Sequence, residues 1–281
     1  MCIRDSTQQA AGDLEAARAT LTRAVELEPD DATLRKQLAS VLDVVADTVG
    51  SAAQRTLAGR LNDELVLGRV PRRELAVEVD RHLTRYIAGV TGQRVNTSAA
   101  VRDFALVGLA FPFALGACDI LTGDVAIFRD TGLLEPHIIA HEFSHRKGYW
   151  QELYAQVLGY LALASSGEPV LRQSALLERL HRNLRVLAGS DRPALDRLMS
   201  DAALRPELRA LLLRLRQPLT GIERGVEAGM RRLYHLRMRA TGQAGISDYD
   251  LGFTNFLYTF ETSPAARQRP HAAGALHRRP A

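Results

Sequence analysis

The sequence predicts a predominantly helical α+β protein in which a small β-sheet precedes a helix that carries a metal-binding motif. Three observations lead to this fold class. Apolar residues recur at helical spacing along most of the chain, a region between residues 95 and 130 has the composition of short strands, and the run HEFSH follows it at residues 141–145. With 281 residues, 46% of them apolar, the chain can form one sizeable domain with an appendage, or two small domains.

Residues 1–50 are expected to form a pair of helices. Small and apolar residues follow the pattern of a tetratricopeptide-type hairpin ending in ELEPDD, namely Ala11, Gly12, Ala16, Ala17, Ala24, Leu27 and Pro29. One such unit cannot bury its apolar face alone, so we expect it to pack on the next domain or on upstream repeats. A protein-binding hairpin and an ordinary amphipathic helix pair are the two alternatives. Residues 1–6 resemble adapter read-through, which leaves open whether Met1 is the natural start.

Residues 51–92 continue as helix, with a break between Gly68 and Pro71. Apolar residues at helical spacing support both parts, namely Leu57, Leu61 and Leu65 before the break and Leu75, Val79 and Leu83 after it. Residues 95–130 then change character, because they are rich in Phe, Val and Ile with Gly and Pro between them. This composition predicts two or three short strands, with a tight turn at residues 122–124 before a strand Val125–Phe128.

Helices dominate the remainder of the chain. Pro136 suits the first turn of a helix that contains HIIAHEFSH, and Gly148 interrupts it before a second helix, ELYAQVLGYLALA. Helices rich in Leu and Arg are expected to about Gly242, followed by a short closing helix over residues 251–260. Residues 263–281 lack apolar periodicity and are predicted to be disordered. The expected organisation is therefore a hairpin at 1–50, a main domain at 51–262 and a tail at 263–281.

Composition excludes several function classes. The formal charge of +4 comes from arginine rather than lysine, and no basic stripe interleaved with aromatic residues indicates nucleic-acid binding. The two cysteines, Cys2 and Cys118, are far apart, so neither a disulfide framework nor a thiolate zinc site is expected. No run approaches the ~18–20 apolar residues that span a bilayer. The longest candidate, Phe104 to Cys118, contains Gly and Pro and is interpreted as a buried strand or loop.

The run HEFSH is an HExxH motif. His141 and His145 are four residues apart, so a helix directs both imidazoles from one face toward one metal ion. Glu142 follows the first histidine and can act as general base on a zinc-bound water. The flanking residues Ile138, Ile139, Ala140 and Phe143 are apolar, as a buried active-site helix requires. Arg146 is the one residue that does not fit, because many such peptidases have an uncharged residue there.

A third ligand is needed, and spacing favours Glu152. On an unbroken helix Glu152 would lie ~10 Å beyond His145, too far for one ion, but a stop at Gly148 lets the chain turn and present Glu152 from the next helix. Gln151 occupies the place of the third ligand in the metzincin pattern and argues against that class. Glu168 is a fallback ligand. His137, ~12 Å from His145 along the helix, is expected in the surroundings of the site.

The stretch EPHIIAHEFSHRKGYWQELYAQVLGYLA resembles the motif of the bacterial domain-of-unknown-function family 3810. The residues that match are Pro136, His141, Glu142, Ser144, His145, Gly148, Tyr149, Glu152 and Ala155, whereas Tyr154 and Gln156 replace a Glu and an Asn. Thr122-Gly123-Asp124 and the segment from Leu233 to Tyr249 resemble two further blocks of the family in the same order. The resemblance implies a zincin-like, gluzincin-type metallopeptidase domain that binds Zn²⁺ through the two histidines and Glu152. It also implies N-terminal membrane helices, so the full-length protein is expected at a bacterial membrane although this chain reads as soluble.

The resulting hypothesis is a zinc-dependent metallopeptidase that hydrolyses peptide bonds in a peptide or protein substrate. Tyr234 and His235 are candidates for stabilising the oxyanion, and the strand Val125–Phe128 is a candidate for pairing with an extended substrate. The alternative is a catalytically inactive zincin-like module, fused to the tetratricopeptide-like hairpin, that binds proteins. Retention of Glu142 favours the enzyme, because binding alone does not require a general base.

Overall fold

A computed structural model describes residues 51–215, apart from residues 69, 105–113, 120, 191, 202 and 203. It also describes residues 225, 228, 229, 232, 236, 253, 254, 256, 257 and 260. The predicted hairpin at 1–50, the predicted tail at 263–281 and the candidates Tyr234 and His235 lie outside these ranges. The described part is mostly helical with a small three-stranded sheet, which confirms the predicted α+β class.

In the described part of the chain, two helices precede the sheet, as predicted for residues 51–92. Helix α4 spans Ser51–Asp63 and helix α5 spans Arg72–Thr91. Pro71 occupies the N-cap position of α5, where its missing N–H costs no helical hydrogen bond. Gly92 ends α5 in the left-handed region with φ of 70°, and its N–H donates to the carbonyl of Ala88.

The sheet contains strands β1 (Arg102–Asp103), β2 (Gly116–Cys118) and β3 (Val125–Ile127) in the order β1-β3-β2. Strand β3 pairs in parallel with β1 and antiparallel with β2. The turn between β2 and β3 closes through Asp119, whose carboxylate accepts the N–H groups of Leu121 and Thr122, and through Gly123 at φ of 70°. The predicted turn at residues 122–124 is thus confirmed.

Six helical elements follow the sheet as far as residue 215, where the continuous description ends. They are η1 (Gly132–Leu134), α7 (Glu135–Arg146), α8 (Glu152–Ala164), α9 (Pro169–Ser190), α10 (Arg192–Ser200) and α11 (Pro206–Leu215). Helix α7 has Pro136 in its first turn and ends before Gly148, and α8 covers the predicted run ELYAQVLGYLALA. Among the described residues, no helix combines the length and the apolar character needed to cross a bilayer.

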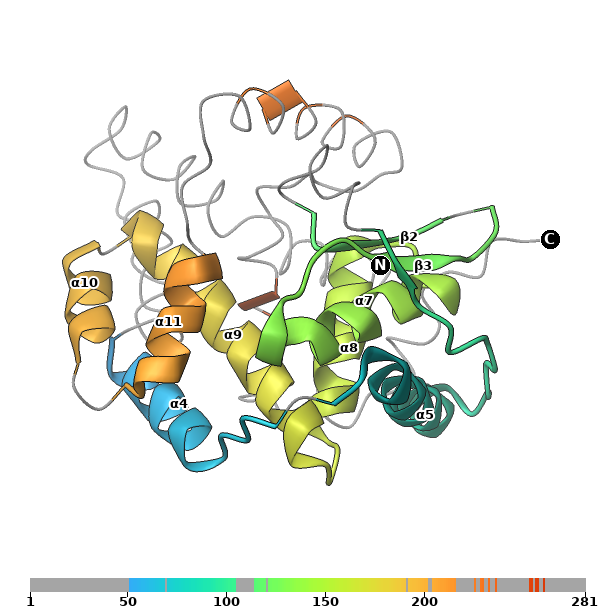
Figure 1. The fold of residues 1–281 in the computed structure, drawn as a ribbon, viewed down its shortest axis with the longest axis horizontal. Coiled ribbons are helices and arrows are strands. Elements are labelled where there is room, and N and C mark those ends of the chain that lie inside the picture. The colour runs from blue at the N-terminus through green and yellow to red at the C-terminus, as the bar shows by residue number, and fades with distance from the viewer. Residues whose placement is uncertain are drawn as a thin grey trace, which may run out of the picture.

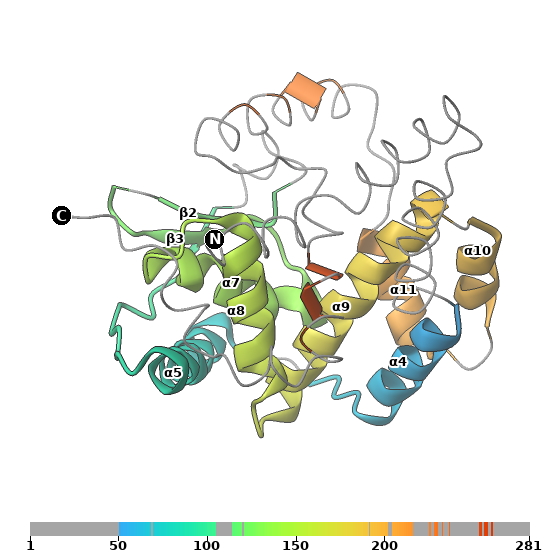
Figure 2. The same cartoon turned by 180° about the vertical axis from the view of Figure 1, so that it is seen from behind.

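Helix α7 occupies the centre of the packing around the sheet. Figures 1 and 2 show α7 beside α8, with strands β2 and β3 along one side of it and α5 on another. Helix α9 separates this group from α4, α10 and α11. Ile139, Ala140 and Phe143 are completely buried, and so are polar positions of α7 such as Ser144. A helix surrounded on several sides has no solvated face, so its polar side chains must be satisfied inside the protein.

Candidate metal centre

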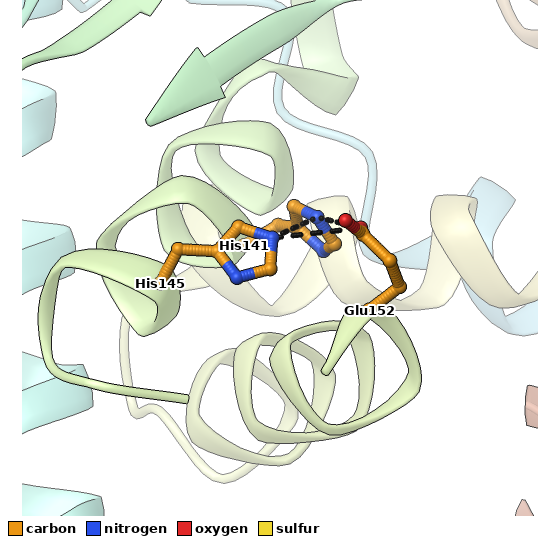
Figure 3. Close-up of side chains that lie close together, drawn as sticks. All are labelled: His141, His145 and Glu152. Atoms are coloured by element: carbon orange, nitrogen blue, oxygen red, sulfur yellow. Dashed lines mark hydrogen bonds and ion pairs between the residues drawn. The ribbon is translucent and has the colours of Figure 1, made fainter. Parts of the chain in front are cut away.

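Side chains from two helices converge on one point. His141 and His145 project from α7, and Glu152 projects toward them from the first residue of α8 (Figure 3). His141 Nε2 lies 3.1 Å from His145 Nε2 and 3.2 Å from Glu152 Oε2, and His145 Nε2 lies 3.5 Å from the same oxygen. A tetrahedral metal ion with ligands at 2.0–2.1 Å places neighbouring ligand atoms about 3.3 Å apart. The three atoms therefore form a triangle of the size that one such ion requires.

The ring orientation of His145 is set by a backbone carbonyl. Its Nδ1 lies 2.9 Å from the carbonyl oxygen of Tyr149, an acceptor that cannot donate. In the neutral imidazole the proton is therefore on Nδ1, and the Nε2 lone pair points toward His141 and Glu152. A ligand histidine whose second nitrogen donates to a carbonyl is the usual arrangement around a protein metal ion.

The turn that ends α7 brings Glu152 into range. Gly148 has φ of 97°, a conformation open to glycine and strained for other residues. The N–H of Tyr149 donates to the carbonyl of Ser144 at 3.0 Å and that of Gly148 to His145 at 2.9 Å, the two bonds of a Schellman motif. The same turn thus stops the helix, presents the Tyr149 carbonyl to His145 and reverses the chain so that α8 begins with Glu152. The predicted helix stop at Gly148 is confirmed.

The three groups are electrostatically coupled. Burial would raise the pKa of Glu152, but hydrogen bonds and positive charge from His141 and His145 hold that pKa well below its usual value. Burial would lower the pKa of His145, yet the hydrogen bond and charge of Glu152 raise it overall. The cluster therefore combines an ionised carboxylate with two imidazoles, and this set of one oxygen and two nitrogens suits a divalent cation.

Glu142 lies on the side of α7 that faces the sheet. It is 7% exposed, and a Cβ atom added to Gly116 of β2 would lie 3.3 Å from its Cγ. Burial raises the pKa of Glu142, while nearby His141, His145 and the backbone of Cys118 act in the opposite direction. A buried carboxyl group that faces a strand beside a group of candidate metal ligands can exchange a proton with a molecule held there.

Arg146, the residue that fitted the motif least, points away from the cluster. Its guanidinium donates to the carbonyls of Gly123, Ser98 and Ala100 at 2.6, 2.5 and 3.0 Å and lies over the ring of Phe143. These bonds attach the turn between β2 and β3, and the segment before β1, to the end of α7. A charged residue after the second histidine is compatible with the site because its role is to hold the sheet against this helix.

His137 is buried on α7, one helical turn before His141, and does not lie at the rim of the site. It is 2% exposed, and burial lowers its pKa to about 4, so it is neutral near pH 7. Its Nε2 lies 3.9 Å from the carboxylate of Glu178, a 2% exposed residue of α9. Gln156 of α8 and Arg182 each donate to Glu178 at 2.5 Å. A buried carboxylate on α9 thus binds Gln156 of α8 and lies beside His137 of α7, in each case one helical turn away from a candidate metal ligand.

Two predictions about the surroundings need correction. The strand Val125–Phe128 cannot pair with a substrate, because β3 lies between β1 and β2 and both of its edges are occupied. Among the described strands it is β2 that borders Glu142 and pairs on one side alone. The fallback ligand Glu168 is not in the cluster; it is exposed, and its carbonyl accepts N–H groups of the first turn of α9.

Two residues beside the site, Trp150 and Glu178, were not predicted from the sequence. Trp150 stacks on the ring of His145, and the carboxylate of Glu178 on α9 accepts a hydrogen bond from Gln156 of α8. The position of Trp150, two residues after the helix-ending glycine, was a signal that could have identified it. Nothing local could have identified Glu178, since it is 22 residues from Gln156 along the chain.

A cavity of about 660 Å³ lies at the other end of α7 and does not include the metal-ligand cluster. Three of its charged lining residues are paired with one another, since Arg72 binds the carboxylate of Glu135 with two bonds of 2.7 Å and also contacts Asp103. The cavity is therefore separate from the cluster of His141, His145 and Glu152.

Comparison with known proteins identifies one related family. A family model described as "Protein of unknown function (DUF3810)" matches residues 13–258. No curated protein and no solved structure matches the chain. The matched range includes the whole candidate metal centre and most of the 281-residue sequence.

Proposed function

The chain belongs to the DUF3810 family, and from this premise we propose that it is a zinc-dependent metallopeptidase with a zincin-like catalytic domain. The observation that carries the proposal is the triangle formed by His141, His145 and Glu152, with Glu142 on the same helix facing β2. Two histidines and one glutamate are a common donor set of catalytic zinc sites, which leave a coordination position open.

The division of roles follows from the positions of the side chains. Zinc bound at this site would supply a Lewis acid that polarises a carbonyl group and acidifies water. Glu142 then takes the proton from the attacking water and returns it to the leaving amine. Its burial against β2 suits this exchange, because a desolvated carboxyl group beside the site can both accept and return a proton.

A peptide is the substrate class that suits the neighbouring strand. Within the part of the chain that the structure describes, β2 pairs with β3 on one edge only, and its backbone lies against Glu142. An extended peptide can align with such an edge through main-chain hydrogen bonds, which place a scissile bond without requiring a particular side chain. Tyr234 and His235 remain candidates for the oxyanion donor.

The test combines metal content with turnover. The purified chain should contain about one zinc per molecule by mass spectrometry, and His145→Ala and Glu152→Ala should lose it. Glu142→Gln should retain zinc and lose hydrolysis of a casein or peptide-library substrate by about 10²-fold or more. Glu168→Ala is the matched control, because it removes an exposed acid near α8 and should change neither quantity.

Two results would overturn the proposal. Absence of zinc after reconstitution with excess metal would mean that the motif no longer binds an ion. Hydrolysis retained by Glu142→Gln would remove the proposed general base. Zinc bound without hydrolysis of any peptide pool would favour the alternative, an inactive protein-binding module that uses the tetratricopeptide-like N-terminal hairpin.

A further inference from the structure

Trp150 is the only tryptophan in the sequence, and it lies directly beside the candidate metal centre. Its ring is stacked on that of His145, with 6.0 Å between centroids and 12° between planes. The residue nevertheless remains 40% exposed, whereas His145 itself is 7% exposed. A large, partly exposed apolar ring beside a polar site offers a contact surface for a ligand.

The backbone on both sides holds Trp150 in place. The preceding residue, Tyr149, is fixed by the Schellman bond to Ser144 and by the contact of its carbonyl with His145. The following residue, Gln151, is the N-cap of α8 and accepts the N–H of Ala155 at 3.0 Å. A ring that is carried by a fixed backbone and stacked on His145 loses little conformational entropy when a ligand packs on it, which makes it an effective wall of a binding site.

We propose that Trp150 forms a substrate subsite next to the metal and selects an aromatic or large aliphatic side chain on the residue adjoining the scissile bond. The inference rests on the proposed peptidase function and extends it to the class of substrate. A cationic side chain could also pack on an indole ring. It would be disfavoured here, because His145 and the ion it is proposed to bind would place positive charge directly behind the ring.

Binding is measured first, without turnover. Zinc-loaded Glu142→Gln is titrated with blocked pentapeptides of alanine that carry Phe, Leu, Lys or Gly at the central position, and the fluorescence of the single tryptophan is followed. The Phe and Leu peptides should change the emission and bind about tenfold more tightly than the Gly and Lys peptides. Equal binding of the four peptides, or tightest binding of the Lys peptide, would overturn the proposal.

Cleavage by the parent protein is then compared among variants, with products identified by mass spectrometry. The parent should cut beside Phe or Leu with about ten- to a hundredfold higher kcat/KM than beside Gly. Trp150→Ala should reduce this ratio to near one with zinc content unchanged, and Trp150→Phe should restore most of it. Phe104→Ala, which removes a 47% exposed aromatic residue from another part of the surface, should keep the full ratio.

The two proposals fail in different ways. Selective binding of the Phe and Leu peptides without cleavage of any peptide would contradict the peptidase function and support the subsite. Cleavage with no preference, in parent and Trp150→Ala alike, would support the peptidase function and contradict the subsite. Loss of zinc from both Trp150→Ala and Trp150→Phe would make the ring a support for His145 and would also overturn the subsite.

Discussion

The carboxylate of Glu178 is buried between α7 and α8, the two helices that carry the candidate metal ligands. It is 2% exposed and accepts hydrogen bonds from Gln156 and Arg182. Gln156 lies one turn after the candidate ligand Glu152 on α8. His137 lies one turn before the candidate ligand His141 on α7, and its Nε2 is 3.9 Å from the carboxylate of Glu178. Replacing Glu178 with Gln should therefore weaken both the fold and the metal site.

The size of the effect follows from the buried Arg182–Glu178 pair. Removing one partner of a buried ion pair costs about 3–5 kcal/mol, because the other charge stays desolvated. The side chain of Arg182 keeps 15% exposure, which places the expected loss near the lower end, about 3 kcal/mol. For a chain of this size such a loss lowers Tm by about 6–12 °C. Metal affinity should fall by about 10- to 100-fold, the usual effect of removing a group that orients ligands.

Urea unfolding of the metal-free protein measures the first quantity, and competition with a chelator measures the second. Asp196→Asn is the matched control, because Arg192 and Asp196 form an i,i+4 pair at 3.0 Å whose side chains are 65% and 61% exposed. That variant should change the unfolding free energy by less than about 0.5 kcal/mol. A Glu178→Gln variant as stable as the control, with unchanged metal affinity, would refute the anchoring role.

The stability difference between the parent protein and Glu178→Gln should depend on pH. Burial would raise the pKa of Glu178, but the positive charge of Arg182 holds that pKa well below its usual value. A carboxyl group whose folded-state pKa is depressed contributes stability above its unfolded pKa, about 4.3, and loses it as pH falls through the folded pKa. The stability difference between parent and Glu178→Gln should therefore be constant from about pH 7 to 5 and shrink below about pH 4.5. Unfolding curves at three pH values check this, and a difference that grew in acid would contradict it.

Two glycines near the site give further predictions. Gly148→Ala should cost about 1–2 kcal/mol, because φ is 97° there, and should weaken metal binding by displacing the Tyr149 carbonyl from His145. Unfolding and chelator titrations check this against Gly167→Ala, where a Cβ meets nothing within 4 Å. Gly116→Ala should lower kcat by about tenfold or more while zinc content stays the same, because the added Cβ would lie 3.0 Å from the Ala126 carbonyl and press on Glu142. The rate of peptide hydrolysis by Gly116→Ala measures this effect, with Gly89→Ala as the control because a Cβ at that helical position meets nothing within 4 Å. An unchanged kcat in Gly116→Ala would show that the contact between residue 116 and Glu142 is unimportant.

Local patterns were sufficient for most of the metal-ligand set. His141 and His145 share a helix face because they are four residues apart, and that spacing is a property of any α-helix. Gly148 could be identified as a stop because glycine readily adopts positive φ, and the stop made Glu152 the third ligand. The helix and turn boundaries were predictable for the same reason, since each depends on residues adjacent in the chain.

Contacts between distant segments decided the remainder. The sequence indicated strands between residues 95 and 130 but not their order, so the predicted substrate strand proved to be the central one and β2 the strand beside Glu142. Arg146 looked unfavourable in the motif until its carbonyl partners, Ser98 and Ala100, were seen 48 and 46 residues away. Glu178 carries no sequence signal, because its role arises only when α9 packs against α7 and α8. Periodicity and turn chemistry act over a few residues and determine elements and ligand spacing, whereas strand order, buried ion pairs and the walls of a site depend on packing between elements that only the folded chain brings together.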